Sequence, residues 1–293
     1  MTFNRDSKLD SGKVSKRGRN AAIGGGSAVV VIGLLLLSQL VGFDLTGLAG
    51  LTGGNDQSAS QTGESPQCTT GADANSNVDC LVVGAANSLD VYWAGESPQM
   101  QVDYRTPQVI LFEGSTSTGC GQASSATGPF YCPPDETIYI DTSFFDELRT
   151  RFGASGGTLS EMYVVAHEWG HHIQQLSGIL SSTDHSLTGP ASDSVRTELQ
   201  ADCLAGAWVG AASTIKDENG VTFLEPVTDA QIADALNAAS VIGDDRIQQQ
   251  SGGGVDPESW THGSSESRQK WFQTGLASGT GACDTFSVPA EQL

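Results

Sequence analysis

A chain of 293 residues has room for one large domain with a full hydrophobic core and a recessed site, and we expect one domain. Its formal charge of −20 is unevenly distributed, because residues 1–20 carry six cations against two acidic residues, a local +4 that leaves the remainder near −24. Such an acidic body repels phosphate groups, so the composition argues against a nucleic-acid partner.

The first distinctive segment is apolar. Residues 21–43 run for 23 positions without a charge, which is long enough for a helix to cross a hydrocarbon layer of ~30 Å. The cations before this segment predict a single-pass cell-membrane protein with residues 1–20 as a basic cytoplasmic tail and the rest of the chain outside the cell. A cleaved signal peptide is the alternative, because small residues follow at Thr46–Gly50, although the apolar run is longer than the usual core of such a peptide.

Residues 44–67 are rich in Gly, Ser, Thr, Gln and Asn and lack the apolar side chains of a packed core, so we interpret them as a flexible linker. Residues 68–293 then form the outer domain. All six cysteines lie in it, and an even number in an oxidising compartment predicts three disulfides.

The periodicity of the outer domain predicts an α+β fold, mostly helical, with a small antiparallel sheet. The capping-box spacing Thr228-Asp-Ala-Gln231 predicts the start of one helix. The expected helices span residues 76–95, 143–152, 158–178, 191–213, 228–242 and 265–275, and the expected strands span residues 108–112 and 137–141.

The stretch that carries the chemistry is Tyr163–Gln174. On a helix, His167 and His171 lie roughly 6 Å apart along the axis and about 40° apart around it, so both imidazoles can face one metal ion. Glu168 is offset by about 100°, which places its carboxylate beside the ion, where it can take a proton from a metal-bound water. His172 is about 100° round from His171, which favours a buried structural role for it.

A hydrolytic zinc site needs a third protein ligand besides the two histidines. Glu198, 27 residues after His171 on another expected helix, is the best candidate. Asp202 lies four residues further on, close to the same helix face, and we expect it to accept the outer ring N–H of His167.

Cys203 lies about 140° away from the face of Glu198, so we predict that it forms a disulfide with Cys283 rather than a metal ligand. The local pairs Cys68 with Cys80 and Cys120 with Cys132 are further predictions, although six cysteines allow about 15 connectivities. We interpret Asp135 and Asp141 as turn or capping groups, with a calcium site as the alternative.

The motif His-Glu-Trp-Gly-His-His-Ile-Gln, followed by Glu-Leu-Gln-Ala-Asp-Cys, resembles the putative neutral zinc metallopeptidase family. The likeness covers about residues 76–286, and the further stretches that carry it are Gly128–Asp135, Tyr139–Phe145, Thr261–Ser265 and Arg268–Phe272. The resemblance implies a zincin-like fold with Zn²⁺ held by His167, His171 and Glu198 and with Glu168 as general base. Trp169 stands where a smaller aliphatic residue is common in the family, which bears on the lining of the pocket.

We therefore predict a membrane-anchored zinc metallopeptidase that cleaves peptide or protein substrates close to the membrane. Its oxyanion needs a hydrogen-bond donor. His262 is the first candidate, with Tyr139 and Tyr163 as alternatives, and a helix-capping role is the alternative for His262 itself.

Two other functions stay open: a non-catalytic outer-surface module with a structural zinc, and a zinc hydrolase of cell-wall amide bonds. Glu168 weighs against the module, because a structural site has no need of a base and tends to supply four protein ligands.

Overall fold

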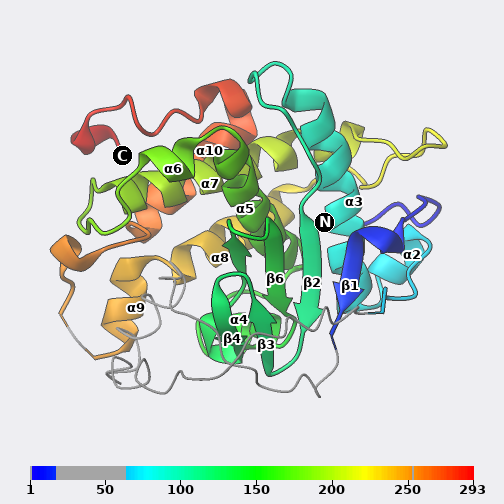
Figure 1. Cartoon of the computed structure of the whole chain (residues 1–293), viewed down its shortest axis with the longest axis horizontal. Helices are drawn as coiled ribbons and strands as arrows, with labels where there is room; N and C mark the ends of the chain where they lie inside the picture. The colour runs from blue at the N-terminus through cyan, green and yellow to red at the C-terminus, as the bar shows by residue number, and fades with distance from the viewer. Residues whose placement is uncertain (1, 18–63, 253) are drawn as a thin grey trace.

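The computed structural model describes residues 2–17, 64–252 and 254–293. These residues form an α+β body in which helices predominate and surround a four-stranded sheet (Figure 1). The expected membrane span, residues 21–43, and most of the expected linker lie outside the described residues. Within the described part of the chain, no helix is both long enough and apolar enough to span a membrane.

The helices expected from the periodicity are present, with ends within a few residues of the predicted ones. The Thr228 side chain accepts a hydrogen bond from the Gln231 backbone N–H, so the predicted capping box is confirmed. These helices are α3 (Val78–Glu96), α4 (Phe144–Thr150), α5 (Thr158–Leu176), α7 (Asp193–Ala211), α8 (Asp229–Val241) and α10 (Ser265–Ser278). Three short helices were not expected, namely α2 (Gly71–Ala74), α6 (Ile179–Ser182) and α9 (Asp244–Gln250).

The sheet differs from the prediction in strand direction. Its order is β1 (Val14–Lys16), β2 (Gln108–Phe112), β6 (Thr137–Asp141) and β5 (Phe130–Cys132). The two predicted strands, β2 and β6, pair in parallel, so the antiparallel arrangement is wrong for them. The reason is that β5 runs antiparallel to β6 and precedes it in the chain, which returns β6 to the direction of β2.

A separate hairpin of β3 (Ser115–Thr118) and β4 (Gly121–Ser124) lies between β2 and β5 in the sequence. The chain thus leaves the main sheet after β2 and comes back to it only at β5. The residues of the two predicted strands do not indicate that the chain leaves the sheet between them.

Residues 2–17, expected to be a tail separate from the domain, pack against it. Phe3 is completely buried, and its ring fills space beside α3, where a Cβ at Gly84 would lie 2.5 Å from a Phe3 ring atom. Strand β1 extends the sheet in parallel with β2. The segment therefore supplies both an edge strand and a core side chain to the domain.

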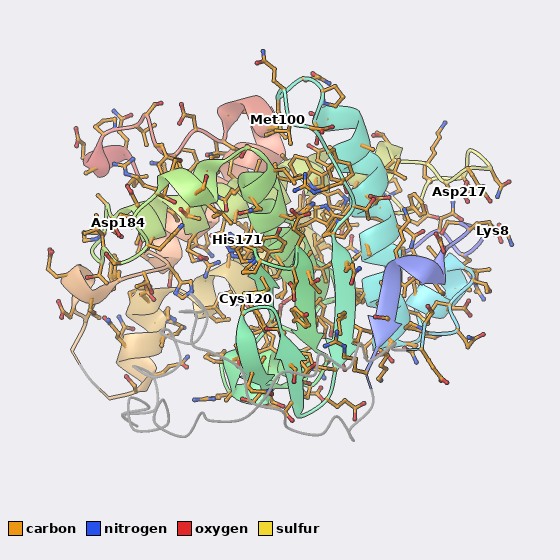
Figure 2. All side chains as sticks on the ribbon, viewed as in Figure 1. Lys8, Met100, Cys120, His171, Asp184 and Asp217 are labelled. Atoms are coloured by element: carbon orange, nitrogen blue, oxygen red, sulfur yellow. A yellow bond between two sulfur atoms is a disulfide. The ribbon has the colours of Figure 1, made fainter. Side chains whose placement is uncertain are left out.

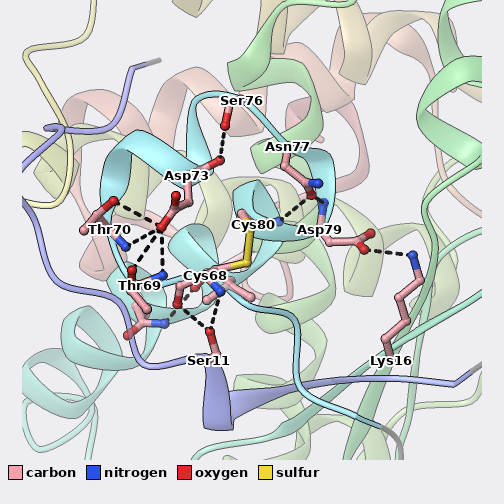
Figure 3. Close-up of a disulfide and its surroundings, with 12 residues drawn as sticks. Ser11, Lys16, Cys68, Thr69, Thr70, Asp73, Ser76, Asn77, Asp79 and Cys80 are labelled. Carbon is pink, nitrogen blue, oxygen red and sulfur yellow. Dashed lines mark hydrogen bonds and ion pairs between the residues drawn. A yellow bond between two sulfur atoms is a disulfide. The ribbon is translucent and has the colours of Figure 1, made fainter.

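Cations of this segment pair with acidic residues of α3. The Lys13 ammonium contacts the carboxylate of Asp90, and Lys16 Nζ lies 2.8 Å from Asp79 Oδ2 (Figure 3). In the same region, Ser11 Oγ donates a hydrogen bond to the backbone carbonyl of Cys68. Opposite charges thus hold a basic segment on an acidic domain.

The segment is also held by backbone contacts near its middle and at its C-terminal end. Lys8 and Asp217 lie side by side in Figure 2, and the Lys8 backbone N–H donates to Asp217 Oδ2 at 2.7 Å. At the C-terminal end of the segment, the Lys16 backbone N–H donates to the Glu64 carbonyl at 2.8 Å. Residues 17 and 64, which flank residues 18–63, therefore lie at the same edge of the domain.

The three predicted disulfides are present and leave no free cysteine among the described residues. They join Cys68 to Cys80, Cys120 to Cys132 and Cys203 to Cys283.

Helices α7 and α10 pack unusually closely. A Cβ at Gly275 of α10 would lie 1.8 Å from the Cys203 carbonyl oxygen, so only glycine fits there. This contact brings the side chain of Arg268, on α10, to the helix that carries Glu198 and Asp202.

Candidate metal centre

The metal ligands come from two helices that cross at a glycine. Gly170 lies between His167 and His171 on α5 and faces Ala201 of α7. A Cβ at Gly170 would lie only 3.0 Å from the Ala201 Cα, so glycine allows the two backbones to approach closely. The crossing point fixes Glu198, three residues before Ala201, opposite the two histidines.

The three expected ligands converge. His167 Nε2 lies 3.1 Å from Glu198 Oε2, and His171 Nε2 lies 3.5 Å from Glu198 Oε1. One ligand atom from each residue lies within 4.8 Å of the other two. A tetrahedral zinc ion with bonds of ~2.0–2.1 Å would separate its ligand atoms by roughly 3.3 Å, so this donor set fits zinc with little movement. His171 lies near the middle of the molecule in Figure 2.

The outer ring nitrogen of His167 meets a charged group. Its Nδ1–H donates to Asp202 Oδ1 at 2.8 Å, the contact expected from the sequence. Arg268 binds the same carboxylate through two nitrogens, at 2.8 and 3.0 Å, and the Tyr163 hydroxyl donates to it at 2.5 Å. Because Asp202 binds Nδ1, Nε2 is the nitrogen that faces the metal position, and it must release its proton when a metal binds.

The outer ring nitrogen of His171 meets a neutral group instead. Its Nδ1–H donates to Gln174 Oε1 at 2.8 Å, and Gln174 Nε2 donates to the Thr197 carbonyl at 2.7 Å. Gln174 thereby links one ligand to the residue next to another, Glu198. This role was not predicted from the sequence, although the spacing of three residues from His171 on one helix was a usable signal.

Buried carboxylates give the centre its electrostatic character. Burial lowers the pKa of His167, but Asp202 and Glu198 outweigh it and raise that pKa to about 10. Burial raises the pKa of Asp202, but Arg268 and His167 outweigh it and lower that pKa to about 2. Asp202 and Glu198 thus stabilise positive charge at His167, and the same carboxylates would favour a bound cation.

Glu168 lies beside the ligand cluster without joining it. Its side chain borders the cleft and is almost completely buried, and this burial raises the pKa of its carboxyl above the ordinary value. The charges of His171 and His167 act in the opposite direction. A carboxylate that borders a metal position without joining the ligands suits proton transfer to and from a water at that position.

His262 approaches the centre from the loop before α10. Its backbone N–H donates to Asp244 Oδ2 at 2.7 Å, and its Nδ1 lies 3.3 Å from Asp244 Oδ1. The ring borders the same cleft, and Glu198 raises the pKa of His262 against the effect of burial. Asp244, which orients this histidine, was not foreseen, because only the fold brings α9 beside residues 261–263.

The two alternative oxyanion donors have other hydrogen-bond partners. The Tyr163 hydroxyl donates to Asp202, and the Tyr139 hydroxyl donates to Asp135 at 2.8 Å. Tyr139 packs in a small separate core of the sheet and does not line the cleft.

Two residues next to the ligands point away from the cleft. His172 is completely buried, with Nδ1 3.0 Å from the Tyr131 hydroxyl and Nε2 2.7 Å from the Arg105 carbonyl, in keeping with a structural role. Trp169 is also completely buried in the main core, so the expectation that it bears on the pocket lining is wrong. Its position on α5 turns it away from the ligand face.

The cleft has a volume of about 630 Å³. The ligand atoms and the side chains of Glu168 and His262 border it together. Its apolar wall includes Phe130, Phe144, Phe152, Leu180, Ile242 and Ile247.

Comparisons with known proteins agree with this geometry. The model of the family described as "Putative neutral zinc metallopeptidase" matches residues 3–286. The uncharacterized protein Rv2575 of Mycobacterium tuberculosis is 54% identical over 224 residues, covering 76% of this chain and 75% of that protein. The uncharacterized protein YpfJ of Escherichia coli K12 is 38% identical over 268 residues, covering 89% and 87%. No solved structure matches.

Proposed function

Because this chain belongs to the putative neutral zinc metallopeptidase family, we propose that it is a zinc-dependent peptidase that hydrolyses peptide bonds. One observation carries the proposal. His167, His171 and Glu198 converge at a cleft, while Glu168 lies beside them as a buried carboxylate that is not part of the ligand cluster. A purely structural site would have no use for that carboxylate or for the cleft.

Each residue has a defined part in this reaction. His167, His171 and Glu198 would hold a zinc ion, which when bound would lower the pKa of a bound water and polarise the scissile carbonyl. Glu168 takes a proton from the attacking water and passes it to the leaving amine. His262, oriented by Asp244, donates a hydrogen bond to the developing oxyanion.

The walls of the cleft favour an extended peptide with bulky apolar side chains. Phe130 and Tyr131 of β5 line the cleft, and β5 lies at one end of the strand order. An edge strand offers backbone groups that can pair with an extended peptide. The apolar wall would then receive the side chains of that peptide.

We also propose that the domain acts outside the cytoplasm and is attached to the membrane through residues 21–43. Three disulfides support an oxidising compartment. The expected cytoplasmic position of residues 1–20 requires residues 2–17 to leave the domain, because a single crossing separates the two sides. Because β1 pairs with β2, these contacts count against a single crossing by residues 21–43 while residues 2–17 are folded onto the domain.

A zinc hydrolase of cell-wall amides is the second candidate, because the same ligands and base would serve it. The apolar wall of the cleft favours the peptidase, since cell-wall polymers are rich in polar groups.

The test uses the full chain, because residues 2–17 are part of the fold. A mixed-sequence peptide library is incubated with the zinc-loaded protein and with its Glu168→Gln variant. We expect cleavage by the parent, lost on chelation and lost in the variant, with zinc still bound to the variant. A variant that cleaved peptides as fast as the parent would refute the role of Glu168.

A further inference from the structure

Three neutral hydrogen bonds lead away from His171 toward the C-terminal segment. The His171 Nδ1–H donates to Gln174 Oε1 at 2.8 Å, Gln174 Nε2 donates to Gln200 Oε1 at 3.0 Å, and Gln200 Nε2 donates to the Cys283 carbonyl at 2.9 Å. Both glutamine side chains are buried, so water cannot replace these partners freely. The row connects α5, α7 and the segment after α10.

The direction of every bond in this row follows from its last member. A backbone carbonyl can only accept, so Gln200 must present its NH₂ group to Cys283 and its oxygen to Gln174. Gln174 must then present its NH₂ group to Gln200, which leaves its oxygen for His171. An oxygen there requires the proton on Nδ1, so the neutral tautomer of His171 is the one whose Nε2 is available to a metal.

A second carbonyl supports the same orientation. Gln174 Nε2 also donates to the Thr197 carbonyl at 2.7 Å. Two acceptor-only groups therefore fix the Gln174 amide, one of them directly and one through Gln200. Thr197 is adjacent to the ligand Glu198, so the amide also ties the α5 ligand to the α7 ligand.

The Cys203–Cys283 disulfide holds the last acceptor of the row. Cys203 lies three residues after Gln200 on α7, so the disulfide fixes the Cys283 backbone beside that glutamine. A cavity of about 260 Å³ borders Gln174, Gln200 and Cys283. This cavity gives Gln200 room to turn once its acceptor moves.

We infer that Gln174 and Gln200 are positioning residues that set the tautomer and direction of the metal ligand His171, and that the Cys203–Cys283 disulfide maintains them. The inference rests on the proposed zinc centre, but it concerns metal affinity rather than catalysis. The disulfide is thus part of the metal centre through two intervening side chains, as well as a link between α7 and the C-terminal segment.

The test measures the zinc dissociation constant of the full chain by competition with a chelator of known affinity. We expect Gln174→Ala to weaken zinc binding about 10- to 100-fold, as removal of a hydrogen-bond partner of a ligating histidine commonly does. Gln200→Met, which keeps the volume and the burial but removes the amide, should weaken it less. The Cys203→Ser/Cys283→Ser variant should resemble Gln200→Met.

The Cys68→Ser/Cys80→Ser variant is the matched control, because its disulfide joins the segment before α3 to α3, whereas the row runs from α5 through α7 to Cys283. It should bind zinc as the parent does. Unchanged affinity in both Gln200→Met and Cys203→Ser/Cys283→Ser, with folding verified by circular dichroism, would overturn the inference. Gln200→Met keeps the test decisive if the cysteine variant does not fold.

A second readout isolates the tautomer. In the zinc-free protein, the ring ¹⁵N shifts of His171 should show a proton on Nδ1 in the parent and a mixture of tautomers in Gln174→Ala. A parent in which Nε2 carries the proton would contradict the inference. Absence of zinc binding by the parent itself would instead count against the proposed function, so the two failures are distinguishable.

Discussion

The two histidine ligands share a helix and a metal position, yet their outer nitrogens are supported by different chemistry. His167 is held by a charged cluster, Asp202 with Arg268, whereas His171 is held by the neutral amide of Gln174. We refer to these as the charged side and the neutral side of the centre. Both sides use α7, but the charged side also depends on α10, and the neutral side also depends on the Cys283 segment.

This difference determines how much stability is lost when a partner is removed from each side. A buried ion pair is expensive to break, because the remaining partner becomes an uncompensated charge. A buried amide that loses its partner costs much less. The charged side should therefore govern folding as well as zinc binding, and the neutral side should govern mainly the direction of one ligand.

The largest expected effect is that of Asp202→Ala, which leaves Arg268 buried without a counter-charge. We expect the free energy of unfolding of the zinc-free protein to fall by about 3–5 kcal/mol. Urea unfolding monitored by circular dichroism measures it. If Gln174→Ala lowers the free energy of unfolding as much as Asp202→Ala does, the proposed difference between the charged and neutral sides is wrong.

The pH dependence of stability should also separate the two sides. The pKa of Asp202 is about 2 in the fold, below the usual value near 3.9, so its ionised form stabilises the native state above about pH 4. That contribution is lost as the pH falls from about 4 toward 2, because the unfolded state takes up the proton first.

The measurement is the difference in unfolding free energy between the zinc-free parent and a variant, followed from pH 5 to pH 2. For Asp202→Asn the difference should shrink as the pH falls. For Gln174→Ala it should stay constant, because no amide titrates. A flat difference for Asp202→Asn would mean that the carboxylate is not stabilised as described.

A smaller effect is expected for Tyr163→Phe, which removes one hydroxyl from the charged side. Arg268 still holds Asp202 through two nitrogens. The hydroxyl donates to Asp202 and accepts from Arg268 Nη2, so we expect a loss of about 1.5–3 kcal/mol in stability and nearly unchanged zinc affinity. A loss of zinc affinity as large as that of Gln174→Ala would show that the hydroxyl, and not the ion pair, directs Asp202.

The smallest effect is expected at the pair of Lys13 and Asp90, which joins the N-terminal segment to α3. This pair also joins a cation to an aspartate, but through one nitrogen, and it is partly exposed, at 23% and 14% of the two side chains. Lys13→Ala should cost about 0.5 kcal/mol, as is typical of ion pairs near water. A cost near that of Asp202→Ala would show that burial does not explain the difference between the pairs.

Local patterns explain why so much of the site could be predicted. His167, Glu168 and His171 share one helix, whose face follows from a period of 3.6 residues. Glu198 was found because a third ligand was required and because its own helix was visible in the sequence. The helices with strong periodicity were placed within a few residues for the same reason.

The missed features depend on contacts between distant segments. The relative direction of β2 and β6 depends on the path of the chain between them. Strand β1 was missed because a short basic segment beside an apolar run resembles a cytoplasmic tail. Arg268 was noticed only as part of a family-like stretch, and its contact with Asp202 requires the close packing of α7 and α10.

The most direct test of the account is the zinc content of the full chain and its variants, measured by native mass spectrometry after equilibration with limiting zinc. We predict one zinc ion per chain in the parent and in Glu168→Gln, and loss of that ion in His171→Ala and in Glu198→Ala. Zinc retained by folded His171→Ala and Glu198→Ala at the parent's affinity would contradict the assignment of the metal centre.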